Sequence, residues 1–277
     1  MSIKISAAEV KKLRKETGAG MMDCKKALVE TQGDFQAAID YLRKKGQKMT
    51  AKRADRDAKE GVIIAVTSPA EDKGILIRLS CETDFVAKNE TFITFAQRIA
   101  NVALESFPAT REELLHTAYD DSTIVEKVTE STAVIAEKIE LSAYERIEAP
   151  KVVAYTHMGY RAGVIVGFNR AEVDSSSVGK DIAMQIAAMH PVAVDKTHID
   201  PEIVAKELEI GMEQARNQGK PDHLVQRIAQ SKLQTFFKEK TLLHQEFVKD
   251  HKKTVQQYLR SIARDLTVTA FKHLKLG

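Results

Sequence analysis

Two short stretches of the sequence carry side chains suited to gripping another molecule. In the first, Met21 and Met22 directly follow a glycine-rich unit, residues 18–20. The glycines interrupt one helical pattern and Asp23 is placed to cap the next, so we expect the two methionines at the tip of an interhelical turn. Flexible methionine pairs are common on surfaces that bind partners, although apolar side chains more often fold back onto a core.

The second stretch, residues 83–86, falls at an expected junction between a strand and a helix. If Asn89 caps the helix that follows, Asp84 and Phe85 lie on an exposed turn, where an aromatic ring beside a carboxylate can enter a partner's pocket. If the helix is continuous instead, the seven-residue spacing from Phe85 to Phe92 places Phe85 on the core face and makes Asp84, or the residue before it, an N-terminal cap. The sequence leaves both interpretations open.

No motif of a catalytic site stands out in this sequence. It lacks the glycine-lysine pattern of a phosphate-binding loop and a serine in a nucleophile elbow. Cys24 and Cys81 lie far apart, and the histidines are scattered without the spacing of metal ligands. We therefore expect a protein that is not an enzyme, with no cofactor, no metal and no small-molecule substrate.

The composition indicates a multidomain globular protein rather than a nucleic-acid or membrane protein. The chain has 277 residues, of which 43% are hydrophobic, so more than one core is possible. Its net charge of +3, from 42 basic and 39 acidic residues, is not the basic surplus of a dedicated nucleic-acid binder. Without an apolar run long enough to span a membrane or an apolar signal core, the sequence predicts no membrane partner and a cytoplasmic location.

The elements predict an α+β fold in which one plan occurs twice. A small helical unit comes first, with a capping box formed by Ser6 and Glu9 and a later cap at Asp34. Strand-like alternation begins at Gly61, and a hairpin followed by a helix then occurs twice, beginning near residues 62 and 152, which indicates a duplicated α+β core with antiparallel sheets. The expected units are a three-helix N-terminal domain (1–45), a charged linker (46–60), a first core half (61–138), a second core half (139–198), a helical hairpin (199–240) and a C-terminal segment that returns to the second half as a strand (241–277).

The helical hairpin is expected to protrude from the core. Pro201 opens one helix, and a turn at Gly219–Pro221 leads to a second helix of similar length that Asp222 is placed to cap. Two helices joined by a tight turn pack antiparallel, and their narrow apolar stripe suits contact with each other more than burial in a larger interior.

The segments Leu13–Leu28 and Cys81–Asn89 resemble two signatures of the bacterial elongation factor Ts family, in the right order and about sixty residues apart. The resemblance extends over nearly the whole chain. It implies a ubiquitin-associated type of three-helix bundle at the N-terminus and binding to elongation factor Tu, a GTPase, as a guanine-nucleotide exchange factor.

The resemblance also implies roles for particular residues. The aspartate and phenylalanine of the second signature enter the nucleotide-binding domain of elongation factor Tu near its magnesium and phosphate region, and His157 occupies the counterpart position in the second half, where an ordinary strand-end histidine is an equal alternative. The residues expected to disturb the magnesium site are Thr83, Asp84, Phe85, Val86 and His157. The residues expected to anchor the partner are Leu13, Gly18, Gly20, Met21 and Met22.

A rival function from another class rests on the connector Arg43–Glu60. Basic residues outnumber acidic ones there, as in a solvated helical or flexible linker, but also as in a contact with RNA. The alternative is therefore a ribosome- or RNA-associated binding protein, whose binding would weaken strongly with salt.

Overall fold

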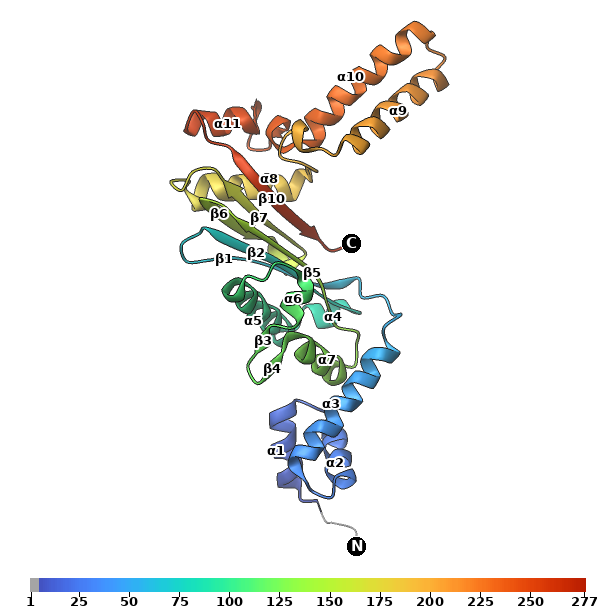
Figure 1. Ribbon diagram of the computed structural model, residues 1–277, viewed down its shortest axis with the longest axis vertical. Coiled ribbons are helices and arrows are strands. Elements are labelled where there is room, and N and C mark those ends of the chain that lie inside the picture. Colours follow the sequence, from blue (N-terminus) through green and yellow to red (C-terminus); the bar gives the residue numbers. More distant parts are fainter. Residues whose placement is uncertain (1–4) are drawn as a thin grey trace.

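The computed structural model describes residues 5–277 as an elongated molecule (Figure 1). A helical bundle lies at one end, a core of helices and antiparallel sheets lies in the middle, and a helical hairpin projects at the other end. The predicted α+β class is confirmed. Residues 1–4 of the predicted first unit lie outside the described residues.

The bundle consists of α1 (Ala7–Thr17), α2 (Met21–Glu30) and α3 (Phe35–Lys52). Its termini follow the local signals in the sequence. Ser6 and Glu9 form the predicted capping box at α1, and the side chain of Asp34 accepts a hydrogen bond from the backbone N–H of Ala37 at the start of α3. The small interior of the bundle holds apolar side chains from all three helices. The finer likeness to a ubiquitin-associated bundle stays a prediction.

Helix α3 continues past residue 45, where the sequence analysis ends the first unit. Glutamine, lysine, methionine and alanine, which favour helix, make up most of residues 46–52, and this stretch carries no proline. At Gly46 the helix lies against α7 (Ile124–Ile135) of the core, since a Cβ atom added there would be 3.3 Å from the Cβ of Ala133. The first half of the predicted linker is therefore a helix that packs on the core.

The first sheet has the strand order β1-β2-β5 and is antiparallel throughout. Its strands are β1 (Glu60–Thr67), β2 (Lys73–Cys81) and β5 (Glu140–Glu148). The elements between β2 and β5 are α4 (Asp84–Ala87), α5 (Glu90–Ser106), α6 (Arg111–Leu115), β3 (Ala118–Tyr119), β4 (Ser122–Thr123) and α7 (Ile124–Ile135). They form one apolar core with the outer face of the sheet.

The position of β5 corrects the predicted boundary between the two core halves. The second half was expected to begin at residue 139, but β5 pairs with β2, so it belongs to the first sheet. The free edge of β2 needs partners for its backbone N–H and C=O groups, and β5 supplies them. Alternation along a strand predicts its faces but carries no information about which edge it joins.

The second sheet repeats the plan with the order β10-β7-β6. Its strands are β6 (Lys151–Thr156), β7 (Ala162–Phe168) and β10 (Val268–Lys275). Its outer face is covered by α8 (Lys180–Met189), and α11 (Val255–Ile262) adds side chains to the same apolar core. The tail thus returns to this sheet, and a hairpin followed by a helix occurs twice, as predicted. The short elements in this half are η1 (Met158–Tyr160), η2 (Ser175–Gly179), η3 (Lys196–His198), η4 (Leu242–His244), β8 (Glu246–Phe247) and β9 (Asp250–Thr254).

The two sheets pack face to face through an apolar layer. Ile63 and Leu76 from the first sheet meet Val152 and Ile165 from the second. The approach is close at Gly163, where an added Cβ atom would lie 2.7 Å from a methyl group of Ile63. The core therefore has four layers of secondary structure, in the order helices, sheet, sheet, helices. Apolar side chains fill the space between the two sheets.

The hairpin consists of α9 (Pro201–Asn217) and α10 (Asp222–Lys240), which project from the second sheet (Figure 1). Asp200 caps α9 and Pro201 occupies its first turn. Asp222 is the first residue of α10 rather than its cap, because the helix begins directly after Pro221. Small side chains let the helices approach closely, since an added Cβ atom on Gly211 would lie 3.1 Å from Cα of Ala229.

The hairpin should be separable from the core. The chain segments that flank it already meet, because the backbone N–H of Leu242 donates to the carbonyl of Ala193 at 2.9 Å. Replacing residues 201–238 with a short Gly-Ser linker should leave one cooperative thermal transition, followed by near-UV circular dichroism. A core that loses its cooperative transition would contradict the modular architecture.

Candidate partner-binding site

The turn that carries Phe85 contains two separate helix starts. The side chain of Thr83 caps the single-turn helix α4 by accepting from the backbone N–H of Val86 at 3.4 Å. Asn89 then caps α5, accepting from the backbone N–H of Thr91 at 2.8 Å. The continuous helix is therefore wrong, and the exposed turn is confirmed. Phe85 is 83% exposed.

The neighbours of Phe85 hold α4 against the core and set its charge. Val86 and Ala87 pack on the apolar core of the first half, so they anchor the turn from below. Asp84 accepts a hydrogen bond from the ammonium of Lys88, one helical turn later, at 2.6 Å. This hydrogen bond holds the pKa of Asp84 below its usual value. An ionised carboxylate thus stands beside an exposed ring.

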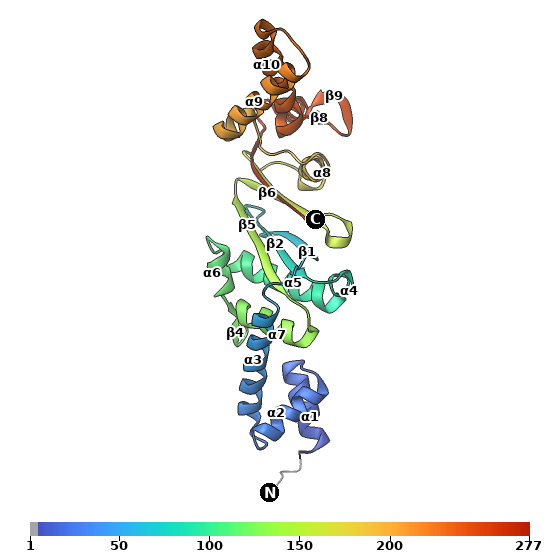
Figure 2. The same ribbon diagram turned by 90° about the vertical axis from the view of Figure 1, so that its right-hand side faces the viewer.

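His157 lies in the turn between β6 and β7, close to the same end of β1 as α4. Arg161 in this turn pairs with Glu60, the first residue of β1, at 3.0 Å. Glu60 is also the strand partner of Cys81, which directly precedes the α4 turn. Figure 2 shows α4 and the β6–β7 turn on the same side of the molecule. The structure therefore brings His157 and Phe85 to one side.

The ring of His157 is exposed and oriented by a neighbour. The hydroxyl of Tyr155 lies 2.9 Å from Nδ1 of the ring, so Nε2 is the nitrogen available to another molecule. Tyr155 itself packs against the core of the second half. His157 is thus more than a loose surface side chain, since a partly buried tyrosine holds one side of its ring.

The methionine pair lies at the start of α2 and not at the tip of a turn. Met21 and Met22 form the first turn of this helix, and Gly20 is the residue before it. Asp23 lies inside the helix, so its predicted role as a cap is wrong. Gly18 ends α1 with φ of 68°, a left-handed conformation that glycine adopts without strain. Both methionines remain accessible, at 50% and 74% exposed.

Leu13 and Val29 change the composition of the expected anchor. Leu13 is fully buried in the bundle core, so its predicted contact with a partner is wrong and its role is to support α2. Val29 was missed, although it is 52% exposed. It follows Met22 by seven residues and shares its helix face. An apolar residue at that spacing was the available sequence signal.

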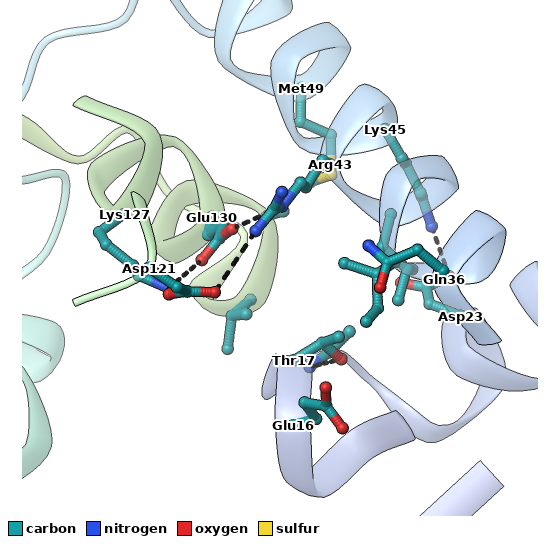
Figure 3. A pocket seen from close by; sticks show the side chains of 15 residues that line it. Glu16, Thr17, Asp23, Gln36, Arg43, Lys45, Met49, Asp121, Lys127 and Glu130 are labelled. Carbon is teal, nitrogen blue, oxygen red and sulfur yellow. Dashed lines mark hydrogen bonds and ion pairs between the residues drawn. The ribbon is translucent and has the colours of Figure 1, made fainter. Parts of the chain in front are cut away.

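The bundle is fixed to the core by an ion cluster between α3 and α7. Arg43 reaches from α3 to Glu130 at 3.3 Å and to Asp121 at 3.8 Å, and Lys127 bridges both carboxylates (Figure 3). A cavity of about 150 Å³ lies beside this cluster, between bundle and core. Charged contacts of this half-exposed kind orient the two units more than they stabilise them.

A wider cleft lies between the end of the bundle helix α1 and the first core half. It has a volume of about 790 Å³ and is bordered by Thr17 at the end of α1, Val86 in α4, Phe95 in α5 and Val134 in α7. The end of α1 and the α4 turn thus both border one hollow.

Comparison with known proteins identifies the family. A family model described as Elongation factor TS matches residues 82–277. Elongation factor Ts of Christiangramia forsetii is 48% identical over 274 residues, 99% of both chains. That of Amoebophilus asiaticus is 48% identical over 274 residues, again 99% of both chains, and that of Porphyromonas gingivalis is 45% identical over 274 residues, 99% of this chain and 98% of the relative. The chain belongs to the elongation factor Ts family. It is thus an elongation factor of protein biosynthesis.

The residues matched by the family model and by the full-length relatives include both candidate surfaces. The family model begins at Glu82, directly before the α4 turn, and the alignments with full-length relatives also span nearly all of the bundle. Within residues 5–277, no helix is long and apolar enough to cross a membrane. The same part of the chain holds no group of three or more side chains arranged to bind a metal ion.

Phe85 is exposed and Phe92 is buried, so truncating them should change the free energy of unfolding by different amounts. Phe85→Ala should change the free energy of unfolding by less than ~0.5 kcal/mol, because its side chain is in water. Phe92→Ala should cost ~3–5 kcal/mol, because Phe92 is buried in the first core. Urea unfolding followed by circular dichroism measures both. A loss above 2 kcal/mol for Phe85→Ala would show that its ring packs in the fold.

Proposed function

We propose that this chain is a cytoplasmic guanine-nucleotide exchange factor for elongation factor Tu. One observation carries the proposal: Phe85 is 83% exposed on a single-turn helix that Val86 and Ala87 anchor in the core. A large apolar side chain held in water on a firm base contributes little to the fold and suits insertion into a pocket of another protein.

The mechanism requires no bond-making step by this chain. A GTPase holds its nucleotide through phosphate contacts and a magnesium ion. Asp84 and Phe85 enter the nucleotide-binding domain of elongation factor Tu and displace the packing that supports the magnesium site. Because binding is reciprocal, a factor that binds the distorted, nucleotide-free state more tightly lowers the affinity for GDP by the same ratio. GTP then binds from solution and completes the cycle.

The other exposed groups provide affinity and orientation. Met21 and Met22 contact the same domain of the partner from the bundle, with Gly18 and Gly20 shaping the turn before them. His157 offers Nε2 on the same side of the molecule as Asp84 and Phe85. We call these two residues the wedge. The α9–α10 hairpin contacts a further domain. Thr83 and Val86 act from below the surface, by capping and anchoring α4.

The rival RNA-binding function loses support from the ion pairs of the connector. Arg43 pairs with Glu130, and Arg53 and Arg56 both pair with Glu82. Guanidinium groups already neutralised by carboxylates of the same chain attract phosphates less. We therefore propose a protein partner and no nucleic acid.

The wedge is tested by the rate of GDP release from elongation factor Tu. Phe85→Ala should lower the catalysed rate at saturating factor by at least about tenfold, as expected when a central aromatic contact is removed. Fluorescent GDP preloaded on the partner and chased with excess GTP reports the rate by stopped flow. An unchanged rate at equal folded concentration would refute the wedge.

The anchor is tested by affinity rather than by rate. The double variant Met21→Ala/Met22→Ala should weaken binding to nucleotide-free elongation factor Tu by about tenfold, while the rate at saturation stays near the wild-type value. Titration calorimetry measures the affinity. Ile262→Ala is the matched control, because it also truncates an exposed apolar side chain, on α11 at the far end of the core. Equal affinity of the double variant and the control would show that the methionines do not contact the partner.

A further inference from the structure

Glu137 holds the Phe85 turn from outside the local sequence. Its Oε2 atom accepts hydrogen bonds from the backbone N–H groups of Glu82 at 3.1 Å and Thr83 at 3.0 Å. Its Oε1 atom accepts from the Thr83 hydroxyl at 2.7 Å. Glu137 lies between α7 and β5, more than fifty residues further along the chain. One carboxylate thus satisfies three donors at the entrance to α4.

Glu82 makes a second set of bonds at the same place. Its carboxylate accepts from Arg53 at 2.8 Å, from Arg56 at 3.0 Å and from the backbone N–H of Lys138 at 2.6 Å. Burial opposes ionisation of Glu82, but these three donors outweigh it and hold its pKa below the usual value. The Lys138 ammonium in turn donates to the carbonyls of Ala54 and Arg56.

We infer that Glu137 and Glu82 form a carboxylate clamp whose function is to position the Asp84–Phe85 turn and to connect it to the end of α3. The inference rests on the proposed exchange function for its consequence, since it names the residues that aim the wedge. Both carboxylates are occupied by donors of this chain, so we assign them as positioning residues. Nothing in the sequence pattern of residues 83–86 points to them.

The clamp is needed because α4 is too short to hold its own direction. A helix of one turn has few internal hydrogen bonds, and the Thr83 hydroxyl that caps it is itself oriented by Glu137. Two peptide N–H groups fixed by one carboxylate also fix the backbone just before the turn. A displacement of the exposed ring by about 1 Å is enough to spoil a fitted contact.

The clamp also makes the bundle part of the same rigid platform. Arg53 is the C-cap residue directly after α3, and its side chain and that of Glu82 are both mostly buried. Charge-assisted hydrogen bonds between such groups are stronger than exposed ion pairs. The end of α3 is therefore held against the turn, which keeps the distance between α2 and Phe85 constant while a partner binds to both.

The first test compares three variants in catalysed GDP release from elongation factor Tu. Glu137→Ala removes the carboxylate that accepts all three hydrogen bonds and should lower the rate at saturating factor by about tenfold. Glu137→Gln should stay within about threefold of wild type, because an amide oxygen can accept from both N–H groups while the NH₂ group donates to the Thr83 hydroxyl. Glu105→Ala, which removes an exposed carboxylate on α5, is the matched control and should leave the rate unchanged.

A double variant separates positioning from general destabilisation. If Glu137 acts through the ring, then Glu137→Ala should have no further effect on the rate in a Phe85→Ala background. Equal fold-losses in the two backgrounds would show a role unrelated to the wedge and would overturn the inference.

The second test needs no partner. Hydrogen exchange of the free protein should show the amides of Glu82 and Thr83 protected in the wild type and in Glu137→Gln, and at least about tenfold faster in Glu137→Ala. Unchanged exchange in Glu137→Ala would overturn the clamp. If the clamp is confirmed here while wild-type protein fails to accelerate GDP release, the exchange function is wrong and the clamp stands.

Discussion

The apolar layer between the two sheets is the contact on which the rest of the molecule depends. Ile63 and Leu76 on one side and Ile165 on the other are fully buried there, and Gly163 allows the close approach. Each sheet also packs its other face against helices, so the central strands β2 and β7 are covered on both faces. Burial of apolar area stabilises the folded core by roughly 25 cal/mol per Å². The turns that connect the buried strands remain at the surface, where they are accessible to a partner.

The stacking places two turns from different halves at one end of β1. The α4 turn follows β2, the neighbour of β1 in its own sheet, while the β6–β7 turn reaches Glu60 from the other sheet. Neither turn supports the fold through its exposed side chain. Phe85 and His157 are therefore free to differ in chemistry from their surroundings, because a change there leaves the core intact. A firm base and an exposed contact are separate requirements, and different residues meet them.

In the bundle, too, the residues that support the fold differ from those exposed for contact. Its interior is small, and Leu13 and Leu28 fill it, while Met21 and Met22 remain outside. Such a unit would swing freely on a flexible linker. The continuous helix α3, the close contact at Gly46 and the bonds from Arg53 to Glu82 hold it beside the core instead. The proposed binding surface thus extends across two units that behave as one platform.

Local chemistry was readable from the sequence, and contacts between distant segments were not. The caps at Ser6, Asp34 and Asn89 were predictable because a cap involves residues within one turn of each other. The repeated hairpin and helix followed from alternation in the same way. The pairing of β5 with β2, the burial of Leu13 and the bonds of Glu137 to the α4 turn were decided by the tertiary structure. The seven-residue spacing by itself favoured Phe85 on the core face. The packing of Val86 and Ala87 on the first core decided for the exposed turn, because it leaves the ring of Phe85 outside.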